Sequence, residues 1–291
     1  MQSDCGGSVA QFLGLSNRKD EMLNSNLTDR QYWDSRYADS GQQARLQDWS
    51  PVRDYDCMTL EKLLTRELLG CGARTMLEIG CGNSIWLPYY AKRLGVRVTG
   101  IDYVESACEQ AKDRLRVCGV NGAILCQDVF KVTAEEIGQY DLVFSQGVIE
   151  HFSDINGTVR KFIEFVRPGG VLFTWIPNFP SFHSRLAKFW HPAVWAKHNM
   201  AAKKGLVPAY HVCGVNEVRH GCAGVFSLNL TAWGVEPRFP RTEKSCMPCI
   251  NFARRATNRI LFKIGRFEPV FDWLAPFYYV AGNKGPESRA V

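Results

Sequence analysis

The fold is decided by residues 76–84, which read MLEIGCGNS and lie between a short apolar run and an amphipathic stretch. The apolar run, Thr75 to Ile79, is predicted to be a strand, and Ile85 to Leu94 a helix. Gly80 and Gly82 allow the backbone to turn sharply between the two elements and to approach a ligand closely. Because doubly wound α/β folds bind nucleotides at the carboxyl ends of their strands, this loop predicts a nucleotide-type site.

The same alternation of strand and helix continues along the chain. Further strands are predicted at 96–101, 123–126, 141–145 and 171–176, with helices at 104–118 and 155–166. Strands separated by helices of this length require right-handed crossovers and form parallel sheets that are covered on both faces. The predicted fold class is therefore α/β, with a doubly wound, mostly parallel sheet.

Five segments are predicted around this alternation. Residues 1–27 are expected to be a flexible tail, 28–72 a helical lid, 73–177 the α/β core, 178–210 an insertion above the sheet, and 211–291 the completion of the sheet. The lid helix is predicted to open at Thr28, which with Gln31 has the spacing of a capping box. A second helix is expected at 58–69. Near the end, strands are expected at 238–239 and 277–281, with a basic amphipathic helix at 250–264 between them.

Composition excludes several classes of protein. The 291 residues are 46% hydrophobic and 22% charged, which is typical of a globular chain with a real core and excludes disorder, coiled coil and collagen. No run approaches the roughly 18 apolar residues of a membrane span. The eleven cysteines are an odd number in a long chain, so we expect reduced thiols and a cytoplasmic protein.

The charge is divided unevenly along the chain. Residues 1–164 hold 18 basic and 23 acidic side chains, whereas residues 165–291 hold 17 basic and 6 acidic ones, within a formal net charge of +6. An acidic first part suits a cationic ligand, and a basic second part suits an anionic ligand or surface. The alternative is that solvated faces differ by chance.

Three acids sharpen the prediction for the ligand. Asp102 ends the second strand, where a carboxylate can accept hydrogen bonds from both ribose hydroxyls, and Asp128 follows the third strand. Ile85 occupies the position where a dinucleotide fingerprint requires its third glycine. Glu78, two residues before Gly80, disfavours a pyrophosphate and favours a positive charge. The sequence therefore predicts a nucleoside that carries a cation.

With these motifs the chain resembles the class I S-adenosylmethionine-dependent methyltransferases over roughly residues 32–170. The order of the matches is the family's own: 78–82 resembles the glycine motif, Asp102 the ribose acid, 127–129 the adenine segment, 140–152 the fourth-strand motif and 167–170 the turn before the fifth strand. The resemblance implies a Rossmann-like sheet of seven strands and S-adenosyl-L-methionine as cofactor. It also implies that Glu78 orients the methionine amino group and that Asp128 meets the adenine.

Aromatic residues near the start resemble the family's amino-terminal lid, although simple helix packing would also account for them. The full set of expected cofactor-binding residues is Tyr32, Trp33, Tyr37, Glu78, Gly80, Cys81, Gly82, Asn83, Asp102, Tyr103, Asp128, Val129 and Gln146.

The implied reaction needs little covalent chemistry from the protein. A sulfonium methyl is already activated, so the protein mainly has to align a nucleophile with it and exclude water. A hydroxyl nucleophile would also need a general base, and His151, at the end of the fourth strand, is the expected catalytic residue. The alternative is a histidine that merely bonds the backbone.

The acceptor is expected to be small or lipid-like and anionic, with O-methylation favoured. The fourth strand is followed by 145–148, SQGV, rather than by the Asn-Pro-Pro or Asp-Pro-Pro run of many base methyltransferases, which argues against a nucleic-acid acceptor. The Glu150-His151-Phe152 motif resembles quinone-pathway and natural-product methyltransferases. The expected substrate-binding residues are Asn178, Phe182, His183, Trp190 and His211.

Three other interpretations stay open. Methyl transfer to carbon of an anionic isoprenoid or polyketide is one, and a non-catalytic nucleoside-binding protein that associates with RNA or a membrane is another. Peripheral membrane contact through the basic carboxyl-terminal part is a third. The Cys and His residues between 211 and 249 match no zinc-finger spacing, so no metal is predicted.

Overall fold

The computed structural model describes residues 26–37, 55–190, 195–224, 272–273 and 275–285. The strand expected at 238–239, the basic helix at 250–264 and most of the tail lie outside these ranges. None of the helices within them has the length and apolar character that a segment crossing a bilayer requires.

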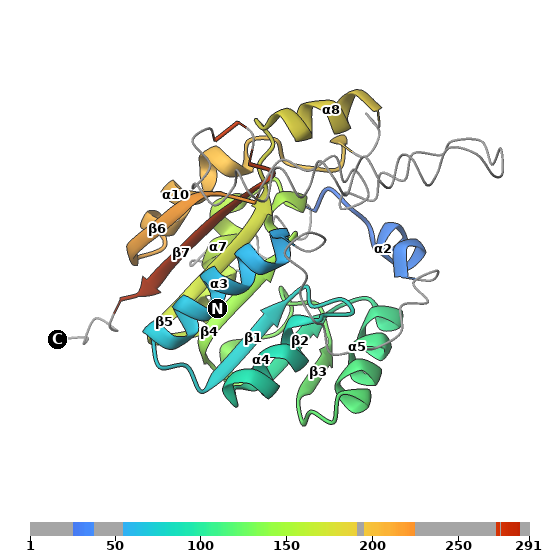
Figure 1. The fold of residues 1–291 in the computed structure, drawn as a ribbon, viewed down its shortest axis with the longest axis vertical. Helices are drawn as coiled ribbons and strands as arrows, with labels where there is room; N and C mark the ends of the chain where they lie inside the picture. The colour runs from blue at the N-terminus through green and yellow to red at the C-terminus, as the bar shows by residue number, and fades with distance from the viewer. Residues whose placement is uncertain (1–25, 38–54, 191–194, 225–271, 274, 286–291) are drawn as a thin grey trace, which may run out of the picture.

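A seven-stranded sheet forms the centre of the molecule (Figure 1). Its strands are β1 (Thr75–Ile79), β2 (Arg97–Asp102), β3 (Ala123–Cys126), β4 (Tyr140–Gln146), β5 (Val166–Pro177), β6 (Val215–Ala223) and β7 (Phe277–Lys284). The order is β3-β2-β1-β4-β5-β7-β6. β1 to β5 pair in parallel, whereas β7 runs antiparallel between β5 and β6. The predicted doubly wound, mostly parallel fold is confirmed.

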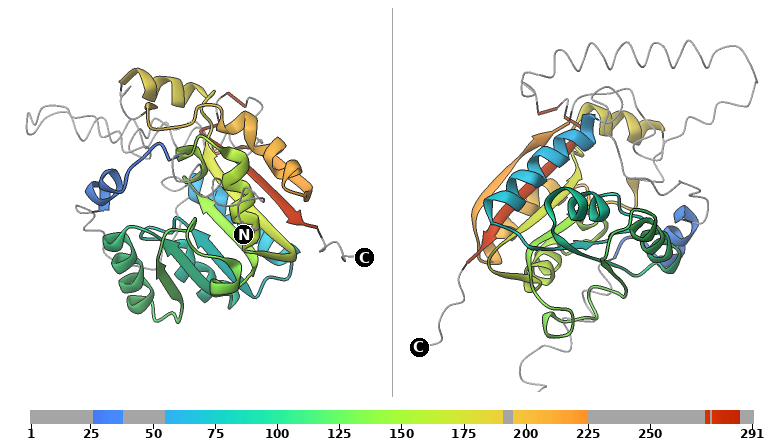
Figure 2. Two further views of the ribbon diagram at one scale, coloured as in Figure 1. Left: turned by 180° about the vertical axis from the view of Figure 1, so that it is seen from behind. Right: turned by 60° about the horizontal axis from the view of Figure 1, so that its bottom comes forward.

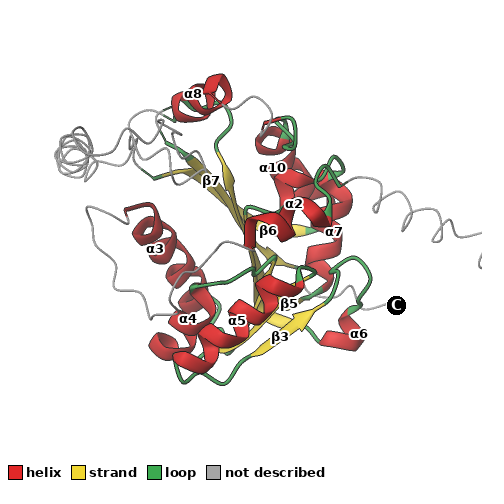
Figure 3. Ribbon diagram, turned by 90° about the vertical axis from the view of Figure 1, so that its right-hand side faces the viewer, coloured by secondary structure: helices red, strands yellow, loops and turns green. Residues whose placement is uncertain are grey.

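Helices cover both faces of this sheet (Figures 2 and 3). One face packs against α3 (Tyr55–Gly70), α4 (Trp86–Leu94) and α5 (Glu105–Val117). The other packs against α6 (Ala134–Ile137), α7 (Ile155–Glu164) and α10 (Ala202–Val212). Since the central strands are buried on both faces, they have continuous apolar runs rather than alternating ones.

The carboxyl end of the sheet carries three further short helices. They are α2 (Arg30–Tyr37), the 3₁₀ helix η2 (Ile149–His151) directly after β4, and α8 (Phe182–Trp190) after β5. Within the segment predicted as a lid, α3 lies on the sheet, because Leu60, Leu64 and Leu68 are buried there, and α2 lies over the carboxyl end. Within the predicted insertion, α10 likewise packs against the sheet, so the remaining described part of the insertion is residues 178–181, α8 and residues 195–201.

Three local expectations differ from the structure. The helix at 155–166 ends at Glu164, because β5 already begins at Val166 beside Tyr140. β6 was not expected at 215–223: it is a sheet edge with a mixed burial pattern, so its sequence lacks the alternation that marks a strand. The cap of α2 is Asp29, whose carboxylate accepts from the Tyr32 amide at 2.7 Å, rather than Thr28.

Candidate active site

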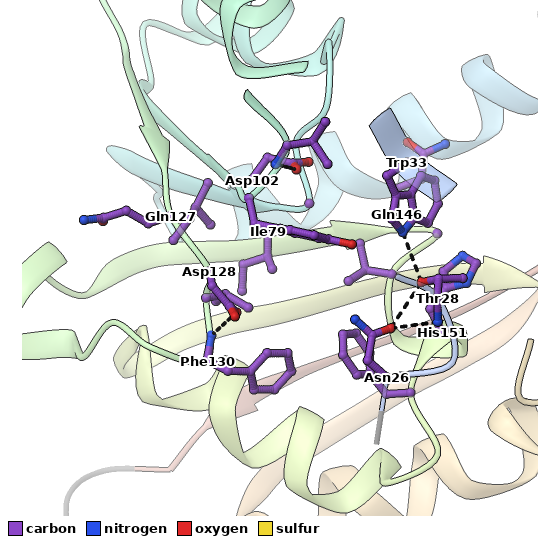
Figure 4. A pocket seen from close by; sticks show the side chains of 18 of the residues that line it. Asn26, Thr28, Trp33, Ile79, Asp102, Gln127, Asp128, Phe130, Gln146 and His151 are labelled. Atoms are coloured by element: carbon purple, nitrogen blue, oxygen red, sulfur yellow. Dashed lines mark hydrogen bonds between the residues drawn. The ribbon is translucent and has the colours of Figure 1, made fainter. Parts of the chain in front are cut away.

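A cavity of about 180 Å³ opens at the carboxyl ends of β1, β2 and β4, with α2 at its rim (Figure 4). Nine of the residues expected from the sequence line it: Trp33, Tyr37, Gly80, Asp102, Tyr103, Asp128, Val129, Gln146 and His151. The expected cofactor residues and the expected base, which are far apart in sequence, therefore share one cavity.

The glycine loop is held in a conformation that side chains would disrupt. Gly80 and Gly82 have φ values of 67° and 47°, in the left-handed region. A Cβ added at Gly80 would collide with Val148, and one added at Gly82 would collide with the hydroxyl of Tyr37. Glycine is thus required both by the turn and by the close approach of neighbouring groups.

Asp102 is fixed by backbone donors at the end of β2. Its two carboxylate oxygens accept from the amides of Gly82, at 2.8 Å, and Val104, at 2.9 Å. Burial raises the pKa of Asp102, although these hydrogen bonds oppose that shift. The carboxylate consequently joins the glycine loop to the second strand at the position expected for a ribose-binding acid.

Asp128 and Gln146 are held on either side of the cavity. One oxygen of Asp128 accepts from the Phe130 amide at 3.0 Å, and its side chain is 29% exposed, so the carboxylate is accessible to a ligand. The Gln146 side-chain oxygen accepts from the indole of Trp86 at 2.8 Å, which fixes the amide at the end of β4.

Glu78 lies beneath the glycine loop and does not line the cavity. Its Oε2 accepts from the hydroxyl of Ser84, and the same hydroxyl accepts from the amides of Trp86 and Leu87 at the start of α4. Burial raises the pKa of Glu78 to about 8. A cation placed near this carboxyl would favour its ionised form.

The remaining expected cofactor residues, Gly82 among them, also lie outside the cavity lining. Cys81 is buried in the core, Asn83 donates to Gln110 at 3.3 Å, and the ring of Tyr32 lies 4.2 Å from the ammonium of Lys197. Gln110 in turn donates to the carbonyl of Tyr37 at 2.9 Å, which connects α5 to the end of α2.

His151 is almost fully buried at the wall of the cavity opposite the acids. Its Nδ1 lies 3.1 Å from the carbonyl oxygen of Lys197. Since a carbonyl can only accept, Nδ1 carries the hydrogen in this bond and the neutral ring has its lone pair on Nε2. Trp33 packs edge-on against the imidazole, with ring centroids 4.9 Å apart. Its neighbour Glu150 is also buried.

The lid helix is anchored to this histidine. The Leu27 amide donates to the His151 carbonyl at 2.7 Å, and Asn26 forms an isolated β-bridge with Phe152. The indole of Trp33 donates to the Thr28 hydroxyl at 3.0 Å. The hydroxyl expected to cap α2 therefore orients a cavity-lining tryptophan instead.

None of the three expected substrate-binding residues whose side chains the structure describes, Asn178, Phe182 and His211, lines the cavity. Asn178 is fully buried and donates to the carbonyls of Asp272 and Ala275, so it holds the loop before β7 against the end of β5. Phe182 is 46% exposed beside Trp273. His211 lies near the start of β6, at the opposite edge of the sheet. The side chains of His183 and Trp190 lie outside the description.

Several lining residues were not expected from the sequence. Phe130 adjoins the adenine segment, and Gly147, Val148 and Phe152 lie within the fourth-strand motif, so these positions are a signal that could have identified them. Asn26 precedes the lid helix, and no local pattern marks it. Among the described residues, no group of three or more His, Cys, Asp or Glu side chains is arranged to hold a metal ion.

Comparison with known proteins gives a family match for the central part of the chain. Residues 77–174 match the family model described as "Methyltransferase domain". The chain is 32% identical to a ubiquinone biosynthesis O-methyltransferase of Bordetella avium over 127 residues, 43% of this chain and 52% of that protein. It is 28% identical to a malonyl-[acyl-carrier protein] O-methyltransferase of Acetivibrio thermocellus over 153 residues, 52% and 51% of the two chains. The chain thus spans about half the length of these curated relatives.

The fold is similar to that of solved methyltransferases. A putative sarcosine dimethylglycine methyltransferase from Galdieria sulphuraria superposes with a TM-score of 0.59 at 15% identity, covering 87% of this chain and 99% of the other. The strand order, the ordered motifs and the family match agree with one another. Residues 77–174, about a third of the chain, therefore match the methyltransferase domain family, and the sheet that contains them has the Rossmann-like fold of methyltransferases.

Proposed function

We propose that the protein transfers the methyl group of S-adenosyl-L-methionine to a hydroxyl of a small or lipid-like, anionic acceptor. The observation that carries this proposal is the shared cavity: the two acids suited to the nucleoside and the buried His151 line the same space. A nucleoside-binding module would require only the acids. A base that lines the same cavity as these acids supports catalysis of a proton-linked transfer.

The residues present fit the proposed cofactor. Asp102 would accept hydrogen bonds from the ribose hydroxyls, and Asp128 would meet the adenine amino group. Because the loop has glycines at positions 80 and 82, its backbone could approach the cofactor closely. Glu78 lies beneath this loop and would be a counter-charge for the cofactor's cation. The cofactor would supply an activated methyl on a sulfonium.

The protein's own part in the reaction is alignment, exclusion of water and removal of a proton. Trp33, Val148 and Phe152 give the His151 side of the cavity apolar walls, which limit the access of water. With its hydrogen on Nδ1, His151 would accept the hydroxyl proton at Nε2 as the acceptor oxygen attacks in line. The names of the O-methyltransferases to which the chain is similar support oxygen as the methylated atom.

Charge supports an anionic acceptor. No acidic residue occurs between Glu164 and Glu217, a stretch that includes α8 and α10. On α8, Phe189 is 78% exposed, and Trp273 beside the same helix is 53% exposed. Exposed aromatics among basic residues at the carboxyl end of the sheet favour a lipid-like acceptor drawn from an anionic surface.

Two measurements test the proposal. Isothermal titration should show binding of S-adenosylmethionine and of its demethylated product, and Asp102→Ala should largely abolish it. The exposed Asp113→Ala on α5 is the matched control. His151→Ala should lower turnover about 100-fold or more while it leaves cofactor affinity nearly intact. No binding of either nucleoside by the wild-type protein would refute the proposed function.

The acceptor can be identified directly. Incubation with methyl-labelled cofactor and a cell extract, followed by mass analysis of the labelled product, should give an O-methylated anion. A product methylated on carbon would instead support the C-methyltransferase alternative.

A further inference from the structure

A second histidine packs directly against the proposed base. The rings of His151 and His198 have centroids 4.5 Å apart and planes inclined by 46°. His198 comes from the segment after Trp195, which is 5.7 Å away ring to ring. Trp33 contacts His151 edge-on (Figure 4). The imidazole of His151 thus contacts both an indole and another imidazole.

The two histidines differ in their access to water. His151 is 5% exposed, whereas His198 is half-buried. Burial disfavours the charged form of an imidazole, which favours protonation of the more accessible of two rings. A positive charge on one ring opposes a second proton on a ring at this distance, and this is the arrangement in which two groups titrate as a coupled unit.

We propose that His198 is a positioning residue that keeps His151 neutral and able to accept a proton under conditions where a lone histidine would be partly protonated. This inference rests on the proposed role of His151 as the base. His198 acts in two ways: its ring packs against that of His151, and its charge discourages protonation there. The adjacent Lys197 carbonyl fixes which nitrogen of His151 accepts.

The charged groups that the structure describes near the pair have other interactions. Lys197 directs its ammonium toward the ring of Tyr32, and Asp154 caps α7 by accepting from Gly157. Asp128 lies across the cavity. Burial raises the pKa of Glu150 to about 8, so this neighbour is largely uncharged near neutral pH. All of these groups persist when His198 alone is replaced.

The test is a histidine titration by NMR, which needs no turnover. The ring C–H signal of His151, assigned by its loss in His151→Gln, is followed from pH 4 to 9 in the wild-type protein and in His198→Phe. Phenylalanine retains an aromatic ring but has no charge. The wild-type signal should titrate in two steps, and in the variant it should titrate in one step with a midpoint about one pH unit higher. His211→Phe, at the far edge of the sheet, should leave the signal unchanged.

A single-step wild-type curve, or the same midpoint in His198→Phe, would overturn the proposal. If circular dichroism shows that His198→Phe does not fold, the number of titration steps in the wild-type curve is sufficient to test the proposal. When turnover of an active preparation is measured against pH, the acid limb of the profile should shift to higher pH in His198→Phe, by about the same interval as the NMR midpoint. Failure of the proposed function would give a different result: the wild-type protein would not bind the cofactor, but the signal of His151 would still titrate in two steps.

Discussion

Glu150 is a buried acid whose replacement should stabilise the protein in a pH-dependent way. It lies between the cavity-lining Val148 and the proposed base and is 1% exposed, and among the described residues its carboxyl oxygen Oε2 has no hydrogen-bond partner. Burial raises the pKa of this carboxyl from 4.5 to about 8. The perturbation is Glu150→Gln, which preserves the shape of the side chain and removes its titration.

The magnitude follows from proton linkage. Below pH 4.5 the carboxyl is protonated in both states, so titration does not alter stability. As pH rises toward 8, the unfolded chain releases the proton while the folded chain retains it, and stability falls by about 1.4 kcal/mol per pH unit. The wild-type protein should therefore lose about 3 kcal/mol by pH 7 through Glu150 alone.

The assay is urea unfolding of both proteins at several pH values between 4.5 and 8. The free energy of unfolding of Glu150→Gln minus that of the wild-type protein should increase by about 3 kcal/mol from pH 4.5 to pH 7. The exposed Glu109→Gln, which removes a surface pair with Lys112, should change by less than about 1 kcal/mol and show no such trend. A difference for Glu150→Gln that stays constant across this range would refute the reasoning.

Three further outcomes are expected. Affinity for the cationic cofactor should rise with pH up to about 8 and then level off, because burial raises the pKa of Glu78 to about 8 and a cation pairs with the ionised carboxylate. Titration calorimetry at several pH values should show a flatter dependence of affinity on pH for Glu78→Gln than for the wild-type protein. Thr28→Val should weaken cofactor affinity by up to about tenfold, since it removes the hydrogen-bond acceptor of the Trp33 indole. Unchanged affinity would show that this hydrogen bond does not contribute to cofactor binding. Arg219→Ala should lower the free energy of unfolding, measured by urea titration, by about 1–2 kcal/mol, because Arg219 is partly exposed but pairs at 2.7 Å with the buried Glu67. A decrease below about 0.5 kcal/mol would contradict this.

Local patterns were sufficient for most of the sheet. The strand that precedes Gly80 and the strand that ends at Asp102 were placed within a residue or two, because buried parallel strands have compact apolar runs with a ligand-binding turn at one end. β6 was missed, since a strand at the edge of a sheet needs no apolar alternation. The end of the helix before β5 was misplaced because the sequence does not show where sheet pairing begins.

The site was predictable only in part, for a related reason. Asp102, Asp128 and His151 follow strand ends, and the carboxyl ends of parallel strands meet at one edge. Asn178 also follows a strand, yet its amide is used within the protein to hold the loop before β7. Sequence alone does not distinguish a polar side chain that faces a ligand from one that satisfies buried carbonyls.

The sequence by itself determined the strands β1 to β5, the helices α3, α4, α5 and α7 between or before them, the glycine loop and the acids beside it, because these depend on residues that are close together along the chain. The tertiary structure alone decided that Trp33, His151 and His198, from three separate segments, pack together at one wall of the cavity. It also decided that Glu78 and Glu150 are buried and have raised pKa values. Burial and ring contacts depend on which distant segments exclude water from a side chain, and that information is not local.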